Sequence, residues 1–203
     1  MKYRSLTFIL FIALAGILGA SPEEFDFKDP KGVNNVSFKT EAPVETIKGS
    51  ASGITGKVTF DPANPGAVRG KIVVATPSMR VPNPKMQQHL HSGQWLDAAK
   101  YPEIIFEVVS AKDVKTEGDT TTANVLGRMT IKGTTREITV PVKMTYLKDK
   151  LKQRSGVDGD LLVLRANFNV KRSDFGINPG QMLNKVSDDI QLTLGVAGSA
   201  PRG

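Results

Sequence analysis

The chain of 203 residues has no cysteine. This absence excludes disulfide bridges, a thiol nucleophile, a Cys-ligated zinc site, an iron–sulfur cluster and a lipid anchor on an N-terminal cysteine. Histidine is nearly absent too, with only His89 and His91. These two lie at positions i and i+2, which point in different directions on a helix. We therefore expect no metal site and no required cofactor.

Motifs of catalytic chemistry are also missing. No serine lies in a G-x-S-x-G elbow, and there is no phosphate-binding loop. The 27 Lys and Arg residues exceed the 20 Asp and Glu residues, yet they form no basic block of the kind that binds nucleic acid. The sequence predicts neither an enzyme nor a nucleic-acid-binding protein. An isoprenoid-processing or quinone-linked activity is the one enzymatic alternative left open.

The N-terminus has the pattern of a secretory signal peptide. Lys2 and Arg4 give a positive start, and Leu6–Ala20 is an uncharged, mostly apolar run of 15 residues. A membrane-spanning helix needs about 20 residues, so retention as an anchor is only the alternative. We expect residues 1–20 to be cleaved. Residues 21–203 are then a single domain that is periplasmic or secreted.

Cleavage changes the charge only slightly. It removes Lys2 and Arg4 and no acid, so 25 basic and 20 acidic residues remain, with a net charge of +5. A mild excess of this kind is typical of a solvated surface, and it also favours contact with an anionic membrane surface. The sequence is compatible with a homodimer.

Beyond residue 30, apolar and polar residues alternate with period two. One run has its apolar residues at Ile138, Val140, Val142, Met144 and Tyr146. Such alternation indicates antiparallel strands with one buried and one wet face. Turn signals separate the runs, among them the Asp-Pro-Ala-Asn-Pro-Gly segment at 61–66 and a tight hairpin at 132–134.

The pattern predicts an all-β fold. Strands are expected near residues 33–40, 43–50, 54–60, 67–76, 104–112, 120–131, 135–148 and 161–171, with a ninth near 186–196. The count is open by one, because the glycine-rich stretch 49–56 allows a bend within one long strand. Many strands with one apolar face suit a sandwich or a closed barrel. One Trp and three Tyr are too few for the girdles of an outer-membrane barrel, so the apolar face is expected to point inward.

The stretch from Pro84 to Tyr101 breaks the period-two pattern. It is rich in helix formers, and Gly93 divides it. We expect one or two short helices that form a crossover and cover one end of the barrel.

Three motifs, taken together, resemble the YceI-like family. Residues 89–97 and 100–106, HLHSGQWLD and KYPEIIF, resemble its HLxSxxFFDxxxYPxIxF signature. Residues 127–135, GRMTIKGTT, resemble its GxLTIKGVT hairpin. Residues 171–176 and 186–190 resemble its RxDFG…VSDxV ending, and the three motifs keep the family's order.

The resemblance implies an eight-stranded antiparallel lipocalin-like barrel that holds a long isoprenoid or similar apolar chain in the periplasm or outside the cell. We accordingly expect the protein to bind, and to carry or sequester, a polyisoprenoid or an isoprenoid quinone. A fatty acid or its amide is the alternative ligand. A filled-core envelope barrel with a protein-interaction role is the alternative function.

The physics of such a barrel agrees with an apolar ligand. Eight strands leave room for side chains or for one small ligand. Burial contributes about 0.8 kcal/mol per CH₂, so one isoprene unit contributes about 3 to 4 kcal/mol before ordering costs. The predicted apolar lining consists of Phe38, Val58, Phe60, Ile72, Val74, Ile104, Phe106, Val125, Met129, Val140, Val142, Met144, Leu164, Phe168, Ile190 and Leu192.

We expect the entrance at the end that the helical crossover covers. The predicted entrance residues are His89, His91, Trp95, Arg172 and Asp174. Each also has a structural interpretation. The histidines and Trp95 are suited to packing within the helical cover, and the Arg-Ser-Asp segment at 172–174 is suited to a turn.

Overall fold

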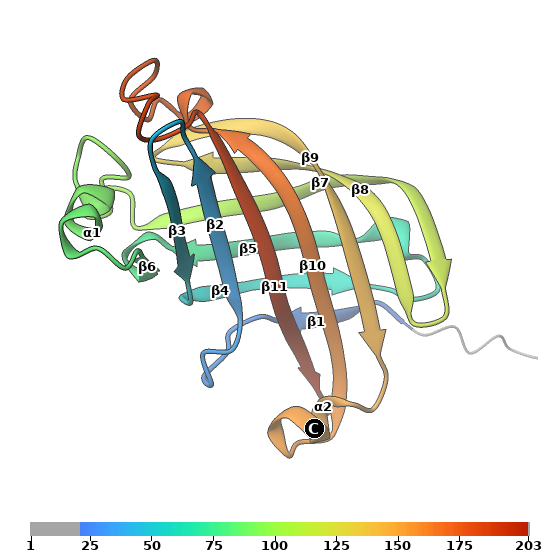
Figure 1. The fold of residues 1–203 in the computed structure, drawn as a ribbon. Coiled ribbons are helices and arrows are strands. Elements are labelled where there is room, and N and C mark those ends of the chain that lie inside the picture. The colour runs from blue at the N-terminus through green and yellow to red at the C-terminus, as the bar shows by residue number, and fades with distance from the viewer. Residues whose placement is uncertain (1–20, 203) are drawn as a thin grey trace, which may run out of the picture.

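The computed structural model describes residues 21–202, so the expected signal segment, residues 1–20, lies outside the described residues. The strands are β1 (Glu23–Asp26), β2 (Asn35–Glu41), β3 (Thr46–Ala51), β4 (Ile54–Phe60), β5 (Arg69–Ala75), β6 (Met79–Arg80), β7 (Glu103–Glu117), β8 (Thr120–Ile131), β9 (Thr134–Leu147), β10 (Gly159–Lys171) and β11 (Asp189–Pro201). The helices are α1 (Pro84–His91) and α2 (Leu151–Ser155), with single 3₁₀ turns η1 (Pro65–Ala67), η2 (Thr76–Ser78) and η3 (Arg172–Phe175). Figure 1 shows how the strands wrap around one interior.

The sheet closes on itself. Its neighbours run in the order β1-β4-β5-β7-β8-β9-β10-β11, and β1 also pairs with β11, so these eight strands form a ring. All the pairings are antiparallel, and β1 meets β11 where Asp26 faces Ser199. β2 pairs with the earlier part of β11 and adds β3 and β6 at that end. The predicted all-β, eight-stranded antiparallel barrel is confirmed.

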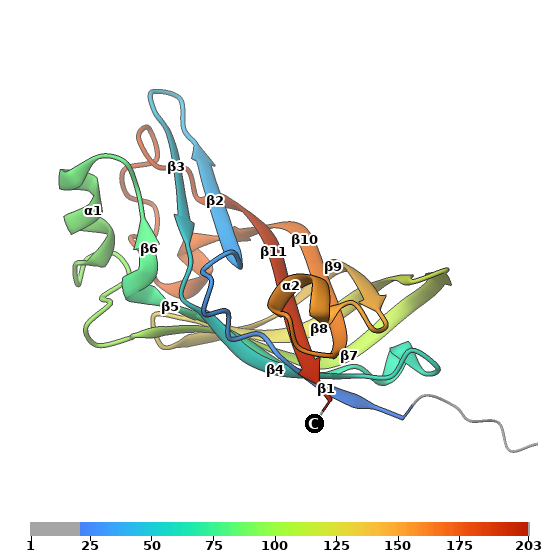
Figure 2. The same ribbon diagram turned by 90° about the horizontal axis from the view of Figure 1, so that it is seen from below.

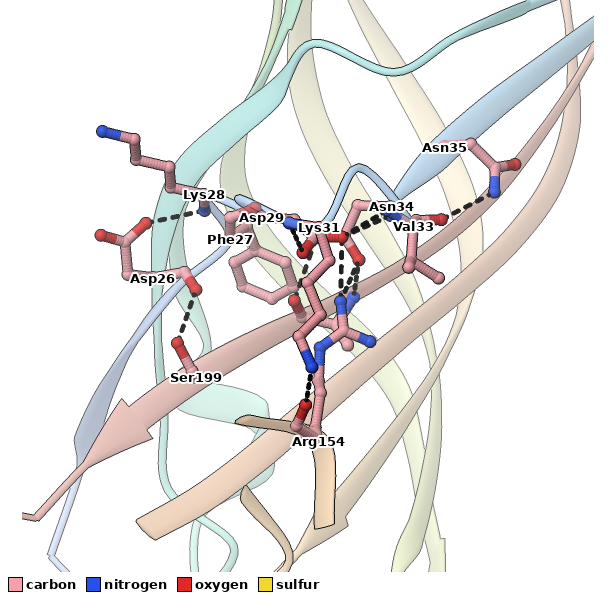
Figure 3. A network of polar contacts seen from close by, with 11 residues as sticks. Asp26, Phe27, Lys28, Asp29, Lys31, Val33, Asn34, Asn35, Arg154 and Ser199 are labelled. Carbon is pink, nitrogen blue, oxygen red and sulfur yellow. Dashed lines mark hydrogen bonds and ion pairs between the residues drawn. The ribbon is translucent and has the colours of Figure 1, made fainter. Parts of the chain in front are cut away.

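A polar network seals the junction between β1 and β11, as Figure 3 shows. Asn34, a residue of the β1–β2 loop that is 2% exposed, bonds through its side chain to the backbone of Ala197 in β11 and of Phe27, the residue after β1. Asp29 holds that loop, because its Oδ2 accepts from the backbone N–H groups of Val33 and Asn34 at 2.7 Å each. Arg154 from α2 donates to the same Oδ2 at 3.0 Å. The loop therefore completes the wall where the two strands barely overlap.

One end of the barrel is solid. The large side chains that fill it, all nearly inaccessible, are Phe25, Phe27, Phe60, Leu162 and Val196. The Tyr146 ring packs edge-on against Phe25 at 6.2 Å between centroids. This end, called the closed end below, lies beside β1 and the last residues of β11.

Most of the strands were predicted closely, and β4 and β8 match their expected ranges. The stretch 49–56 contains a strand break, because β3 pairs with β2 and β6 whereas β4 pairs with β1 and β5. The hairpin at 132–134 is also confirmed. Lys132 and Gly133 are its two loop residues, with φ of 48° and 74°, the left-handed values of a tight hairpin.

The structure corrects other expectations. β1, β6 and α2 were not predicted, because segments of four, two and five residues are too short to show a period. β7 runs to Glu117 and not to residue 112, since bulges in its pairing with β8 break the alternation there. The ninth expected strand begins and ends later than predicted, as β11.

The crossover contains one α-helix. Pro84 opens α1, and the Asn83 side chain accepts from the backbone N–H groups of Lys85 and Met86 at 2.9 and 3.0 Å. The helix ends at His91, and tight turns follow it. Figures 1 and 2 show α1, the tip of the β2–β3 hairpin and the loop before β11 gathered at one end of the barrel.

Candidate functional site

A cavity of about 560 Å³ occupies the barrel. Alternate residues of β10 show how it runs: Leu164, Ala166, Phe168 and Val170 line it, and Arg172 lines it just beyond the strand. These positions span about 26 Å of extended chain. Leu162, the next inward residue toward the closed end, is fully buried and does not line the cavity. The cavity is therefore a blind tube that ends at the packed closed end.

The structure places most of the predicted apolar lining on the wall of this tube. These residues are Phe38, Val58, Ile72, Val74, Ile104, Phe106, Val125, Met129, Val140, Val142, Met144, Leu164, Phe168, Ile190 and Leu192. Phe60 is different. It points inward as expected, but it belongs to the closed end, where its ring lies 6.3 Å from that of Tyr146. Alternation identifies the inward face but not the depth at which the tube stops.

Further wall residues were not predicted. Those on strands, which the same alternation could have identified, include Val36, Ile47, Ala51, Val108, Ile131, Ala166, Val170 and Leu194. Those on turns, loops and α1, where no period marks them, include Val68, Met86, Leu90, Leu96, Ile177, Met182 and Val186.

The glycine that opens the family motif at 127–135 has a structural role. The Phe106 ring lies across Gly127 so closely that a Cβ there would overlap it.

Polar and charged side chains border the tube at the α1 end. Lys85 and His89 come from α1, Glu45 from the turn before β3, and Lys185 from the loop between η3 and β11. Lys85, His89 and Lys185 are exposed, whereas the apolar wall deeper in the tube is buried. This end is called the mouth. It lies beside the helical crossover, where the entrance was predicted.

The predicted entrance residues separate into two groups. His89, Trp95 and Arg172 line the cavity, whereas His91 and Asp174 do not. The Nε2 atom of His91 lies 3.1 Å from the carbonyl oxygen of Met79, and this contact ties α1 to β6. This contact gives His91 a structural role at the junction of α1 and β6. Within residues 21–202 no group of three or more His, Asp or Glu residues is placed to hold a metal ion.

Arg172 organises one side of the mouth. Its guanidinium donates to the backbone carbonyls of Ile177, Asn178, Gln181, Val186 and Ser187. It also lies over the Trp95 ring, 5.6 Å from its centroid, as a cation–π contact. Burial lowers the pKa of Arg172, and the Asp188 carboxylate opposes that shift. One buried cation thus fixes the loop 176–188 against the cavity wall.

The turn at 172–174 is closed by Ser173, not by Asp174. The backbone N–H and the hydroxyl of Ser173 donate to the two carboxylate oxygens of Asp188, at 2.9 and 2.7 Å. Burial alone would raise the pKa of Asp188, but these bonds from Ser173 hold it below the ordinary value. Because Asp188 lies at the far end of the loop, the contact fastens both ends of the loop together.

A second polar cluster lies at the closed end, away from the tube. Asp160 is fully buried, and its carboxylate accepts from the Tyr146 hydroxyl at 2.5 Å, from the Asp149 backbone N–H at 2.8 Å and from Arg202 at 2.5 Å. Burial, then the bond to Asp160, raises the pKa of Tyr146. Burial and Asp160 also raise the pKa of Glu23. No member of this cluster lines the cavity, so we assign it to the stability of the closed end.

An eight-stranded antiparallel barrel around a blind apolar tube defines the class of lipocalin-like barrels. The model of the YceI-like domain matches residues 29–197. The chain therefore belongs to the YceI-like family. Among the residues that the structure describes, no helix is both long and apolar enough to cross a membrane.

Relatives and solved structures agree with this assignment. The chain is 31% identical to a UPF0312 protein of Yersinia pestis over 155 residues, which are 75% of this chain and 73% of that protein. A UPF0312 protein of Pseudomonas aeruginosa is 30% identical over 154 residues, with the same shares of each chain. BcnA of Burkholderia cenocepacia superposes with a TM-score of 0.66 at 22% identity, over 81% of this chain and 95% of that one. A polyisoprenoid binding domain from Saccharophagus degradans superposes with a TM-score of 0.63 at 11% identity, over 89% of this chain and all of that one.

Proposed function

We propose that this protein binds a long-chain apolar ligand inside the barrel, a polyisoprenoid or an isoprenoid quinone, and carries or sequesters it in the cell envelope. The blind apolar tube is the observation that carries the proposal. Its volume of about 560 Å³ lies within the range of about 300 to 1,000 Å³ typical of ligand sites. Its wall is aliphatic and aromatic along β8, β9 and β10, and charged side chains stand at the mouth.

This arrangement suits a ligand with a long apolar body and a small polar end. In the depth of the tube, Val125, Val140 and Met144 offer only hydrocarbon and sulfur surface, so the bound chain gains affinity from each buried carbon. At the mouth, Trp95, His89 and Lys85 offer polar groups to the end that stays in contact with water. The orientation of the ligand follows: apolar tail toward the closed end, polar end beneath α1.

Two further observations support an isoprenoid. The chain belongs to the YceI-like family, and one structure with the same fold is named a polyisoprenoid binding domain. In this proposal the protein has a binding role and no catalytic one, and it needs no cofactor. It acts beyond the cytoplasmic membrane, after residues 1–20 have been removed as the signal pattern predicts.

Organic extraction of the protein, purified gently from its native host, tests the ligand. Mass spectrometry of the extract should show a polyisoprenoid or an isoprenoid quinone in stoichiometric amount. Recovery of a fatty acid or its amide instead would mean that the tube binds a lipid but that the ligand is not an isoprenoid. A protein that is always empty, or that yields only short polar molecules, would contradict the proposal and favour the filled-core alternative.

A matched pair of variants ties the ligand to the tube. Ala166 lines the tube from β10, and its neighbour Asn167 points outward and is exposed. Ala166→Phe should narrow the tube and lower the amount or the length of the chain that is extracted. Asn167→Phe adds a ring on the outer face and should leave the extracted ligand unchanged. Equal extracts from the two variants would place the ligand elsewhere.

A further inference from the structure

Exposed apolar side chains concentrate beside the mouth. Val44, at the tip of the β2–β3 hairpin, is 69% exposed, and Met182 and Leu183, in the loop 176–188, are 52% and 47% exposed. The two segments are joined, because the backbone N–H of Val44 donates to the carbonyl of Asn184 at 3.0 Å. Figure 1 shows them side by side above the barrel. The other large apolar residues that are exposed among residues 21–202 are Val33, Val109 and Val157.

Lysines are also present at the mouth. Lys85 and Lys185 border the mouth and are exposed, and within residues 21–202 neither lies in an ion pair. Glu45 is the acidic residue of the cavity wall at this end, and it is half-buried. The mouth therefore combines protruding apolar side chains with an excess of positive charge.

The apolar tips are held in place. The five carbonyls that Arg172 binds belong to the loop that carries Met182 and Leu183. Within that loop Asn178 and Met182 have φ of 41° and 56°, left-handed conformations that are unfavourable for residues other than glycine. Such a conformation persists only where the surroundings impose it, and here it presents the Met182 side chain to solvent.

We propose that the mouth rim, formed by Val44, Met182, Leu183, Lys85 and Lys185, docks on a lipid bilayer with anionic headgroups. The apolar tips enter the boundary between headgroups and acyl chains, and the lysines contact the anionic lipids. Met182 both protrudes and lines the tube, so it makes a continuous apolar path from the bilayer into the cavity. The inference rests on the proposed function, because it gives the ligand a route that avoids water.

A second copy of the chain fits this rim less well. A symmetric dimer through the rim would bring Lys85 and Lys185 of both copies to one interface, and like charges there oppose association. An anionic bilayer satisfies both the apolar tips and the lysines. Charge complementarity thus favours the membrane over a dimer.

Vesicle co-sedimentation of the full mature chain tests the docking surface. The protein should bind vesicles of phosphatidylcholine that contain phosphatidylglycerol, bind them less at high salt, and bind vesicles of phosphatidylcholine alone weakly. The variant with Lys85→Gln and Lys185→Gln should lose about 25-fold in partitioning, because each lysine near an anionic surface contributes about five-fold. The variant with Val44→Ser and Leu183→Ser should lose at least about ten-fold, because the apolar insertion is removed.

Matched controls lie at the closed end. Val157, next to α2, is 48% exposed, and Lys150 precedes the same helix and is exposed. Val157→Ser and Lys150→Gln should leave vesicle binding unchanged. If the rim variants bind anionic vesicles as the wild type does, or if the wild type does not bind them, the inference is overturned. Dimerisation in solution that the rim variants abolish would also overturn it and would assign the rim to a second copy.

A soluble ligand separates this inference from the proposed function. Farnesol, a short isoprenoid alcohol, should bind the wild type and the Val44→Ser, Leu183→Ser variant equally, because neither residue lines the tube. Native mass spectrometry measures this binding without vesicles. Loss of vesicle binding with farnesol binding intact supports the rim. Vesicle binding by a wild type that takes up no farnesol would instead contradict the proposed function and leave the docking surface standing.

Discussion

The side chain of Asn34 bonds to the backbone of Ala197 as a neighbouring strand would. Its Oδ1 accepts from the Ala197 N–H at 2.9 Å, and its Nδ2 donates to the Ala197 carbonyl at 3.0 Å. The same Nδ2 donates to the Phe27 carbonyl at 3.0 Å. One side chain thus supplies both partners of a ladder position on β11 where β1 and β2 leave a gap.

Replacement of Asn34 should therefore weaken the whole barrel. Asn34→Ala leaves backbone groups of Ala197 and Phe27 buried without partners, at a cost of about 1 to 3 kcal/mol each before water relieves part of it. We expect the free energy of unfolding, measured by urea denaturation, to fall by about 2 to 4 kcal/mol. Asn35→Ala is the control, because Asn35 is exposed and its loss should change stability by less than about 0.5 kcal/mol. Equal losses of stability in the two variants would show that the junction between β1 and β11 does not depend on the Asn34 amide.

The polar network at the junction between β1 and β11 should also make the free energy of unfolding depend on pH. Burial alone would raise the pKa of Asp29, but three backbone N–H donors and the Arg154 guanidinium hold it below the ordinary value. A carboxyl with a lowered pKa in the folded state stabilises the fold above about pH 4 and loses that contribution as the pH falls further. The free energy of unfolding should thus decrease between about pH 5 and pH 2. Asp29→Asn should be less stable at neutral pH and should show a shallower decrease, and an unchanged slope would contradict this.

Charges on the inner and the outer faces of β9 and β10 should have opposite consequences. Val140 and Phe168 line the tube, whereas Thr139 and Asn167, their neighbours along the chain, are exposed. Val140→Lys and Phe168→Asp place an unpaired charge in an apolar tube and should abolish ligand retention or folding. Thr139→Lys and Asn167→Asp should change stability by less than about 0.5 kcal/mol and leave the extracted ligand unchanged. Mass spectrometry measures the retained ligand, and thermal unfolding measures the stability. If both pairs of substitutions are tolerated equally, the tube does not lie on the face assigned to it here.

Trp95 should report the ligand, since it is the only indole in the chain and lines the tube near the mouth. Removal of the ligand and reloading with farnesol should shift its fluorescence emission. Trp95→Ala should speed ligand exchange more than it lowers global stability, and Trp95→Phe should preserve most of the slow exchange. Unchanged emission with farnesol shown to be bound by native mass spectrometry would mean that the segment is a static plug.

Arg172 should not be replaceable by another cation. A lysine has three donors at one nitrogen and cannot satisfy all five carbonyls that the planar guanidinium binds. Arg172→Lys should lower the free energy of unfolding by about 2 to 3 kcal/mol and speed farnesol exchange, because the loop 176–188 loosens. Lys171→Ala is the control. It removes only an exposed ion pair with Asp189 and should cost less than about 1 kcal/mol.

The sequence predicts the inward face of the barrel well, because burial on one face of a strand imposes period two on residues such as Val140, Val142 and Met144. It does not predict depth. Phe60 and Val58 follow the same alternation on β4, yet Val58 lines the tube and Phe60 plugs its end. Only the packing of β1 and Tyr146 against Phe60 decides between them, and these contacts join segments far apart in the chain.

The mouth is harder to predict, because it is built from loops. Met182 and Lys185 follow the end of α1 by 91 and 94 residues, nearly half of the chain, and no local pattern marks them. The family motifs include Arg172, but its partners are backbone carbonyls, which any sequence supplies. Asp188 stands in the last motif, and its contact with Ser173 is a tertiary one that spacing does not reveal.

The pairing of β1 with β11 has a consequence for biosynthesis. The ring joins the first strand of the barrel to the last, so no shorter N-terminal part of the chain encloses a lumen. Closure of so long a loop is slow relative to local pairing. The barrel therefore cannot close while the polypeptide is still leaving the ribosome or passing through any export channel. For the ligand binding proposed above, loading is then a late event, because it requires that the C-terminal strand has been made and has met the N-terminal one.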